Sequence, residues 1–277
     1  MSLVIKSLGT TAPEGAKKLY RDALVEEGSL FLVDFSNKGT LINFNTSVGS
    51  PVFDLSRESS NELGISTQGE ITPGVETSLT EGRGVDFNNS ESGGDKGIIF
   101  SDSLLNYLES NQPHSILIVW LRLNTESDKV GTQVFRTVNG SDASVPNIRL
   151  NYQLPSIGPV ISFGGASSFN QTLLTEPGDL VQIGIEFKGI GNPVSVYKNG
   201  SYLGESSSAT GFAPATHWGI GKMEFSAISA AVVYRTLIED LDVSGRSGLE
   251  VMQKDYNYVN AIGEFEGIVK RPFVDNL

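Results

Sequence analysis

The amino-acid sequence predicts an all-β protein, an antiparallel sandwich in which helices are peripheral. Three observations predict it. About ten short runs rich in β-branched and aromatic residues are separated by turn signals, and several of these runs alternate apolar and polar residues. Glycine accounts for 31 of 277 residues, above the usual ~7%, and most of the excess falls between those runs. Helical spacing occurs only near the two ends and in one short segment between strands.

The first half of the chain contains four predicted strands. Leu30–Phe35 is bounded by Gly28 and by a turn at 37–39. Gly84–Phe87 and Gly97–Phe100 flank a loop of Gly, Ser and Asn residues. Ser115–Leu123 is apolar at nearly every position, which is typical of a central strand covered on both faces.

Two later runs show the alternation of a half-buried strand. In Ile148–Leu154 the apolar residues occupy every second position, and Arg149, Asn151 and Gln153 share the other face. In Val181–Lys188, Gln182 and Glu186 share the outward face with the lysine. We expect these polar residues to form an outward strip that serves as a contact surface.

A hairpin and two further runs complete the predicted strands. Pro193–Lys198 and Ser201–Gly204 are joined by Asn199-Gly200, a pair that favours a two-residue turn because both central residues take positive φ. The runs Trp218–Gly221 and Ala230–Leu237 follow.

Helices are predicted at the periphery. Thr11–Glu14 has the form of a capping box, and apolar residues continue at helical spacing to Gly28. Ser247–Glu250 has the same form and begins a helix whose apolar face extends to Val259, whereas Leu104–Leu108 predicts one short turn.

Three regions follow from this pattern. We expect an N-terminal arm with a short helix at 1–28, the sandwich with its closing helix at 29–261, and an extended C-terminal arm at 262–277. The first apolar run is too short for a signal peptide and precedes Lys6, and no stretch is long enough to span a membrane.

Composition excludes several classes of function. The net charge is 20 − 32 = −12, so a general nucleic-acid binder lacks the basic face it needs. The chain has no cysteine, which excludes disulfides, thiolate metal sites and a cysteine nucleophile. Two histidines leave little room for imidazole chemistry.

The order of several motifs resembles the concanavalin A-like, laminin-G-like family. The motifs are Gly84–Phe87, Ile116–Leu123, Val196–Gly200, Trp218–Gly221 and Val233–Leu237 with the helix that follows it. The resemblance covers about residues 29–261 and implies a jelly-roll sandwich of two curved antiparallel sheets.

Members of this family serve as lectins, glucanases, adhesion modules and parts of bacteriophage particles. The phage proteins are the most similar in acidic balance, lack of cysteine and signal peptide, and flanking arms. The resemblance therefore implies a non-enzymatic virion protein of the tail, fibre, baseplate or capsid decoration, made in the host cytoplasm. We expect it to form a trimer or larger homo-oligomer, to contact other virion proteins and to bind host surface polysaccharide. Two alternatives are a stand-alone carbohydrate-binding module and a glycoside hydrolase of the same fold.

No catalytic residue is predicted. The Glu-x-Asp-x-(x)-Glu pattern of glucanases is absent, and the nearest pairs, Glu264 with Glu266 and Asp240 with Asp242, are interpreted as solvated charges. Neither histidine lies near a Gly-x-Ser-x-Gly elbow, so His114 and His217 are both assigned a structural or exposed role.

Sugar binding requires an aromatic platform together with hydrogen-bonding amides and carboxylates. The candidate residues are Arg149, Asn151, Gln153, Gln182, Glu186, Tyr202, His217 and Trp218. The loop after Gly84 offers oxygen ligands for Ca²⁺, and the candidates are Asp86, Asn88 and Asp95. No other cofactor is expected.

Overall fold

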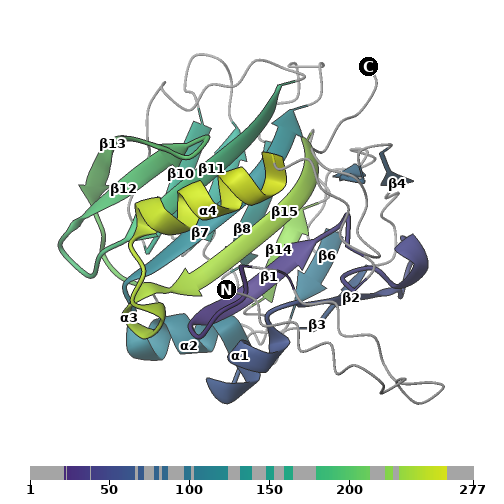
Figure 1. Ribbon diagram of the computed structural model, residues 1–277, viewed down its shortest axis with the longest axis horizontal. Coiled ribbons are helices and arrows are strands. Elements are labelled where there is room, and N and C mark those ends of the chain that lie inside the picture. Colours follow the sequence, from purple (N-terminus) through teal and green to yellow (C-terminus); the bar gives the residue numbers. More distant parts are fainter. Residues whose placement is uncertain are drawn as a thin grey trace, which may run out of the picture.

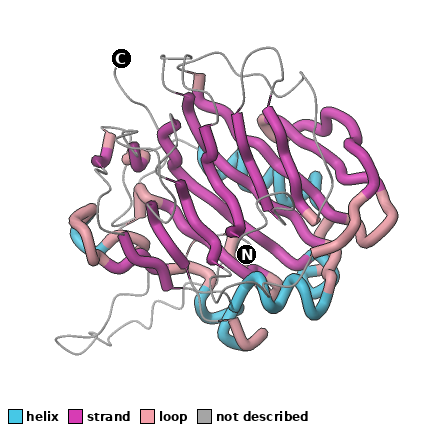
Figure 2. Tube along the Cα trace, turned by 180° about the vertical axis from the view of Figure 1, so that it is seen from behind, coloured by secondary structure: helices cyan, strands magenta, loops and turns pink. Residues whose placement is uncertain are grey.

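The computed structural model describes fifteen strands and confirms the prediction of an all-β antiparallel sandwich. Two sheets of antiparallel strands face each other, and the described helices lie outside them (Figures 1 and 2). The described residues are 22, 24–37, 39–65, 68–71, 78–80, 83–86, 97–100, 103–123, 132–138, 148–152, 159–164, 179–212, 222–226 and 231–260.

The first sheet has eight strands, with the nine-residue β7 near its centre. Their order is β13-β12-β11-β7-β15-β5-β4, and β1 also pairs with β15. The bounds are β1 Ser29–Asp34, β4 Ser78–Leu79, β5 Val85–Asp86, β7 Ser115–Leu123, β11 Leu180–Phe187, β12 Pro193–Lys198, β13 Ser201–Ser208 and β15 Ala231–Asp240.

The second sheet has seven strands in the order β10-β9-β8-β14-β6-β3-β2. The sequence pattern predicts β6 and β9 but not the other five strands of this sheet, several of which are short. The bounds are β2 Pro51–Phe53, β3 Gln68–Ile71, β6 Gly97–Phe100, β8 Thr132–Val138, β9 Ile148–Tyr152, β10 Pro159–Phe163 and β14 Lys222–Ser226.

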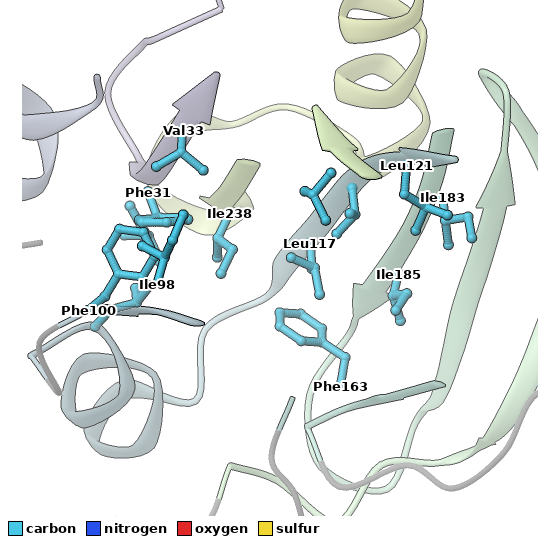
Figure 3. Close-up of a cluster of buried hydrophobic side chains, with 14 of the residues drawn as sticks. Phe31, Val33, Ile98, Phe100, Leu117, Leu121, Phe163, Ile183, Ile185 and Ile238 are labelled. Carbon is cyan, nitrogen blue, oxygen red and sulfur yellow. The ribbon is translucent and has the colours of Figure 1, made fainter. Parts of the chain in front are cut away.

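The main hydrophobic core fills the space between the sheets (Figure 3). Leu117 and Ile185 of the first sheet and Phe100 and Phe163 of the second are buried in it. The rings of Phe31 and Phe100 meet edge to face with centroids 4.9 Å apart, which joins one sheet to the other. This core holds the two sheets together.

A second apolar layer covers the outer face of the eight-stranded sheet. The helix α4 (Gly248–Asn260) lies across that face (Figure 1), and its Met252 is buried with Ile118 and Tyr234 of the sheet. Gly184 of β11 makes room for it, because a Cβ there would collide with the Met252 side chain. At its start, the amide of Glu250 donates to Ser247 Oγ at 3.2 Å, so the predicted closing helix is confirmed.

The remaining helices are short and lie near the ends of strands. They are α1 (Arg57–Glu62), α2 (Ser103–Asn111), α3 (Leu241–Ser244) and the 3-10 turn η1 (Ile42–Phe44). The single turn predicted at 104–108 is in fact the nine-residue helix α2.

The N-terminal helix predicted to reach Gly28 is wrong at its end. Residues 24–28 form turns, because side chains accept hydrogen bonds that a helix would give to its own backbone. The Asp22 carboxylate accepts from the amide of Leu24 at 3.0 Å, and Ser29 Oγ accepts from the amide of Glu26 at 3.1 Å. Residues 1–21, the predicted strand at 218–221 and the arm at 262–277 lie outside the described residues.

Within the described part of the chain, no helix is both long enough and apolar enough to cross a membrane.

Candidate functional site

A hollow lies at the β2 edge of the seven-stranded sheet, where the chain turns before entering that strand. Its volume is about 600 Å³, and we call it the β2 hollow. The residues that line it are Ile42, Asn43, Phe44, Asn45, Ser50 and Pro51. It therefore combines an aromatic ring with amide and hydroxyl groups, which is the mixture found in small-ligand sites.

The backbone at the β2 hollow adopts an uncommon conformation. Asn43 and Phe44 both have φ of 54°, in the left-handed region that a bulky residue such as phenylalanine rarely enters. The amide of Phe44 donates to the carbonyl of Leu41 at 3.0 Å, and that of Asn45 donates to Ile42 at 3.1 Å, which closes the turn. Backbone strain of this kind is concentrated at functional sites in proteins.

The Phe44 ring is held from outside the hollow. The guanidinium carbon of Arg83 lies 4.2 Å from the ring centroid, and Arg83 is not among the lining residues. At this distance the guanidinium and the ring form a cation–π interaction. Phe44 is half-buried.

The polar groups beside the ring are accessible. Asn43 and Asn45 are exposed on either side of Phe44. The Asn45 Oδ1 accepts from the amide of Ser47 at 3.0 Å, and the side-chain NH₂ of Asn45 can donate to a ligand. A pyranose ring presents apolar C–H groups on its faces and hydroxyl groups at its rim. The β2 hollow matches both features, with the phenyl ring for the face and the two amides for the rim.

The outer face of the seven-stranded sheet lies next to the β2 hollow, and we call it the open face because none of the described helices covers it. Gln68 and Glu70 of β3 are exposed there, and the alternate residues Gly69 and Ile71 are buried. Viewed from behind, the described helices lie at one end of the molecule or behind the strands, and none covers this face (Figure 2). Pro51, which lines the hollow, pairs with Glu70.

Two of the predicted sugar-binding residues belong to this sheet. Arg149 and Asn151 are in β9, where Arg149 pairs with Ser162 of β10 and Arg136 of β8. Gln153, His217 and Trp218 lie outside the described residues.

The other two residues of the predicted polar strip are in the eight-stranded sheet and are buried under α4 or its neighbours. Gln182 donates to Asp255 Oδ2 at 2.7 Å and accepts from the amide of Gly200 at 2.9 Å. Glu186 lies beside Gly248, where an added Cβ would be 2.7 Å from its carboxylate carbon. The fold therefore separates Gln182 and Glu186 from Arg149 and Asn151, and the alternation in the sequence did not reveal this.

Glu186 is paired with His114 and Tyr197. Its carboxylate is 2.7 Å from His114 Nε2 and accepts a hydrogen bond from the Tyr197 hydroxyl. Burial raises the pKa of Glu186, but these two hydrogen bonds outweigh it and the pKa is lowered. The same hydrogen bond raises the pKa of His114 against the opposing effect of burial. The structural role predicted for His114 agrees with this pairing.

Tyr202 of β13 lies at the far edge of the eight-stranded sheet. It is 51% exposed, and its ring packs edge to face with that of Tyr197 at 5.7 Å. It is therefore remote in strand order from β9 and belongs to the other sheet.

A buried ionic cluster fastens α4 and the N-terminal segment to the eight-stranded sheet. Arg235 of β15 is fully buried, and its guanidinium nitrogens lie 2.6 Å from Asp22, 2.9 Å from Asp34 and 2.7 Å from Asp255. Burial opposes the charge of Arg235, but the three carboxylates outweigh it and raise its pKa well above the usual value. Trp120 Nε1 also donates to Asp255 at 2.6 Å.

The interpretation of Asp240 as a solvated charge is wrong. Asp240 is buried and caps α3, because its Oδ1 accepts from the amides of Asp242 and Val243 at 3.0 and 3.1 Å. Its Oδ2 accepts from the Tyr107 hydroxyl at 2.7 Å. Asp242 is exposed, and Glu264 and Glu266 lie outside the described residues.

Calcium binding stays a prediction. Asp86 is a half-buried residue of β5, and its suggested co-ligands Asn88 and Asp95 lie outside the described residues. Among the residues that are described, no group of three or more histidine and acidic side chains is arranged to hold a metal ion.

Comparison with known proteins identifies the fold but no family. No family model and no curated protein sequence matches the chain. Trypanosoma rangeli sialidase in complex with sialic acid is similar in structure, with a TM-score of 0.54 and 15% identity over 89% of this chain and 35% of the sialidase. The binding domain of botulinum neurotoxin DC in complex with rat synaptotagmin II has a TM-score of 0.50 and 12% identity, over 88% of this chain and 55% of that one.

The comparison contradicts the prediction that the protein is not an enzyme. A covalent intermediate of the Trypanosoma rangeli sialidase, an enzyme, has a TM-score of 0.53 and 14% identity over 83% of this chain. The chain spans about a third of the length of that sialidase, and the likeness is one of fold. The prediction rested on the missing glucanase motif, and the motif of one enzyme group does not represent every enzyme that contains this fold.

Proposed function

We propose that the protein binds a carbohydrate at the β2 hollow. The observation that carries the proposal is the half-buried Phe44 ring, which lines the hollow between the exposed amides of Asn43 and Asn45. Arg83 contacts the ring, and backbone hydrogen bonds close the turn that presents it, which lowers the ordering cost of binding.

The solved structures of similar fold support a binding role. Their proteins include a sialidase in complex with sialic acid and a toxin binding domain in complex with synaptotagmin II. One of these proteins thus binds a saccharide and the other binds a protein. The mixed aromatic and amide lining of the β2 hollow favours the saccharide for this chain.

A glycan array tests the proposal with three proteins. We expect the wild type to bind at least one saccharide class and Phe44→Ala to lose that binding at least tenfold, because the platform is removed. Tyr202→Ala is the matched control, since it removes an exposed aromatic residue from the other sheet. Equal binding by Phe44→Ala and wild type would place the site elsewhere. If the wild type bound no saccharide, the proposed function would be refuted. Free sugar released from the bound glycans is measured on the same samples, to detect hydrolysis.

The narrower part of the proposal is a bacteriophage virion component that oligomerises through its arms. Its support is the sequence resemblance, and the arms lie outside the described residues. If the arms carry assembly, light scattering gives a trimer or larger for the full chain and a monomer once residues 1–10 and 262–277 are removed. A 29.7 kDa monomer for the full chain would refute assembly and leave glycan binding intact. A monomer would have only one binding site, so several weak sites could not act together to raise the affinity for a glycan.

A further inference from the structure

The β2 hollow is formed by one closed loop. All six lining residues belong to a segment whose ends are joined by a β-bridge between Leu41 and Val52. The loop is also held to β3, because the amide of Gly49 donates to the carbonyl of Ile71 at 2.8 Å and the amide of Ile71 donates to Ser50 at 3.1 Å. Backbone hydrogen bonds thus fix the lining, and the chemistry of its side chains decides which sugar fits.

The lining is uncharged. Its six residues, all of them described, have apolar, amide or hydroxyl side chains. The nearby carboxylate of Glu70 approaches the loop, since its Oε1 is 3.9 Å from the position of a Cβ added to Gly49. A sugar carboxylate in the hollow would lose water without gaining a cation from the lining, and it would be repelled by Glu70. The hollow therefore favours a neutral sugar.

Half of the lining is apolar. Phe44 provides a surface for the face of a sugar ring, and Ile42 and Pro51 provide further apolar surface beside it. Ile42 is 52% exposed, and a large apolar side chain gains free energy when a ligand covers it. A plain hexose has hydroxyl groups around its ring, whereas a methyl group on the sugar would give Ile42 and Pro51 an apolar partner.

Asn45 supplies a hydrogen-bond donor in a fixed orientation. Its Oδ1 accepts from the amide of Ser47 at 3.0 Å, so the oxygen is used within the loop and the side-chain NH₂ is the group that can bind a ligand. A carbonyl oxygen is the matching partner, because it only accepts hydrogen bonds. The lining thus combines an apolar surface with a donor for a carbonyl group.

We infer that the sugar bound in the β2 hollow is a neutral N-acetylated amino sugar. Its ring lies against Phe44, its acetamido methyl group against Ile42 and Pro51, and its acetamido carbonyl accepts from the side chain of Asn45. The inference rests on the proposed function and adds the class of sugar. The acetamido group joins a methyl group to a carbonyl acceptor, which is the combination that the lining matches.

The test compares pairs of sugars that differ in one group. Methyl glycosides of N-acetylglucosamine, N-acetylgalactosamine and N-acetylmannosamine are titrated beside those of glucose, galactose and mannose, with affinities measured by NMR. We expect at least one acetamido sugar to bind about tenfold or more tightly than its hydroxyl counterpart, because the counterpart lacks both the methyl contact and the carbonyl acceptor. N-acetylneuraminic acid should bind more weakly than its methyl ester, which has no negative charge.

Two variants test the two contacts separately. Asn45→Asp keeps the oxygen that accepts from Ser47 and removes the donor, whereas Ile42→Ser removes apolar surface from the lining. Each should lose most of the preference for the acetamido sugar. Val48→Ser is the matched control and should keep the preference, because Val48 is 51% exposed in the same loop and is not a lining residue.

The outcomes separate this inference from the proposed function. A preference that survives in Asn45→Asp or Ile42→Ser, or is lost in Val48→Ser as well, would overturn the inference, as would tighter binding of N-acetylneuraminic acid than of its ester. If the wild type binds hexoses through Phe44 with no preference for the acetamido group, the proposed function stands and only this inference fails. If it binds no sugar of either kind, both fail.

Discussion

The outer faces of the two sheets differ, although both sheets contain strands with alternating polar residues. On the eight-stranded sheet, Gln182 is buried and donates to Met252 and Asp255 of α4, and Arg235 is buried and paired with Asp22. On the seven-stranded sheet, the described helices leave the face open and Glu70 exposed. Polar residues thus fasten α4 and Asp22 to one sheet, whereas Gln68 and Glu70 of the other sheet are exposed.

The largest expected effect is on the covered face. Replacing Arg235 with Leu leaves the buried carboxylates of Asp22, Asp34 and Asp255 without their partner, and we expect a loss of about 3–5 kcal/mol in the free energy of unfolding. Urea denaturation measures it. Arg235→Lys keeps the charge and should lose less. If Arg235→Leu were as stable as wild type, this ionic cluster would not be what fastens α4 and the N-terminal segment.

A smaller loss is expected where α4 meets β11. Gly184→Ala adds a Cβ that collides with Met252, so the helix must shift, at a cost of about 1–3 kcal/mol. Hydrogen exchange should show earlier opening of α4 than in wild type. Gly191→Ala is the control for crowding, since no atom lies within 4 Å of its added Cβ, although its positive φ of 81° brings some strain. If the α4 amides of Gly184→Ala were protected from exchange as well as those of wild type, the contact between Gly184 and Met252 would not be tight.

A weaker, pH-dependent effect is expected from the pair of His114 and Glu186. The pKa of His114 is raised, so its contribution is complete below its unfolded value of about 6.5 and is lost as pH rises through the folded pKa. The pKa of Glu186 is lowered, so its contribution is present above about 4.3 and is lost as pH falls through its folded pKa.

Wild type should therefore exceed His114→Gln in unfolding free energy most clearly between about pH 4.3 and 6.5. Because His114 is partly exposed, we expect the difference to change by less than about 1 kcal/mol from pH 6 to pH 9. Thermal or urea unfolding across this range measures it. A difference that grows with rising pH would reverse the sign and contradict the pairing.

The smallest effect on stability is expected on the open face. Glu70→Gln removes an exposed charge that has no role in the core, so its unfolding free energy should stay within about 0.5 kcal/mol of wild type. The same denaturation experiment measures it. A large loss would mean that the open face, like the covered one, is needed for folding, and would remove the contrast between the two sheets.

The strands predicted most accurately are those whose signal is local. The apolar run Ser115–Leu123 is β7 with the same bounds, and the Asn199-Gly200 turn has the two positive φ values, 49° and 74°, that its sequence predicts. Strands as short as β2 and β4 were missed, because two or three residues carry too little periodicity to be recognised.

The candidate site depended on tertiary structure. Phe44 carries no signal in the sequence, since it follows Asn43 in a segment without periodicity. It became a candidate because the turn places its ring beside Pro51 and under Arg83, almost forty residues away.

The sequence by itself determined the local alternation and the turns, and with them the class of the fold. It assigned Arg149 and Gln182 alike to an outward polar strip, because a period of two distinguishes only the two faces of one strand. The tertiary structure decided that Gln182 lies beneath α4 and that Arg149 is aligned with Arg136. Both outcomes depend on pairings between segments far apart in the chain, and the period within one strand carries no information about its partners.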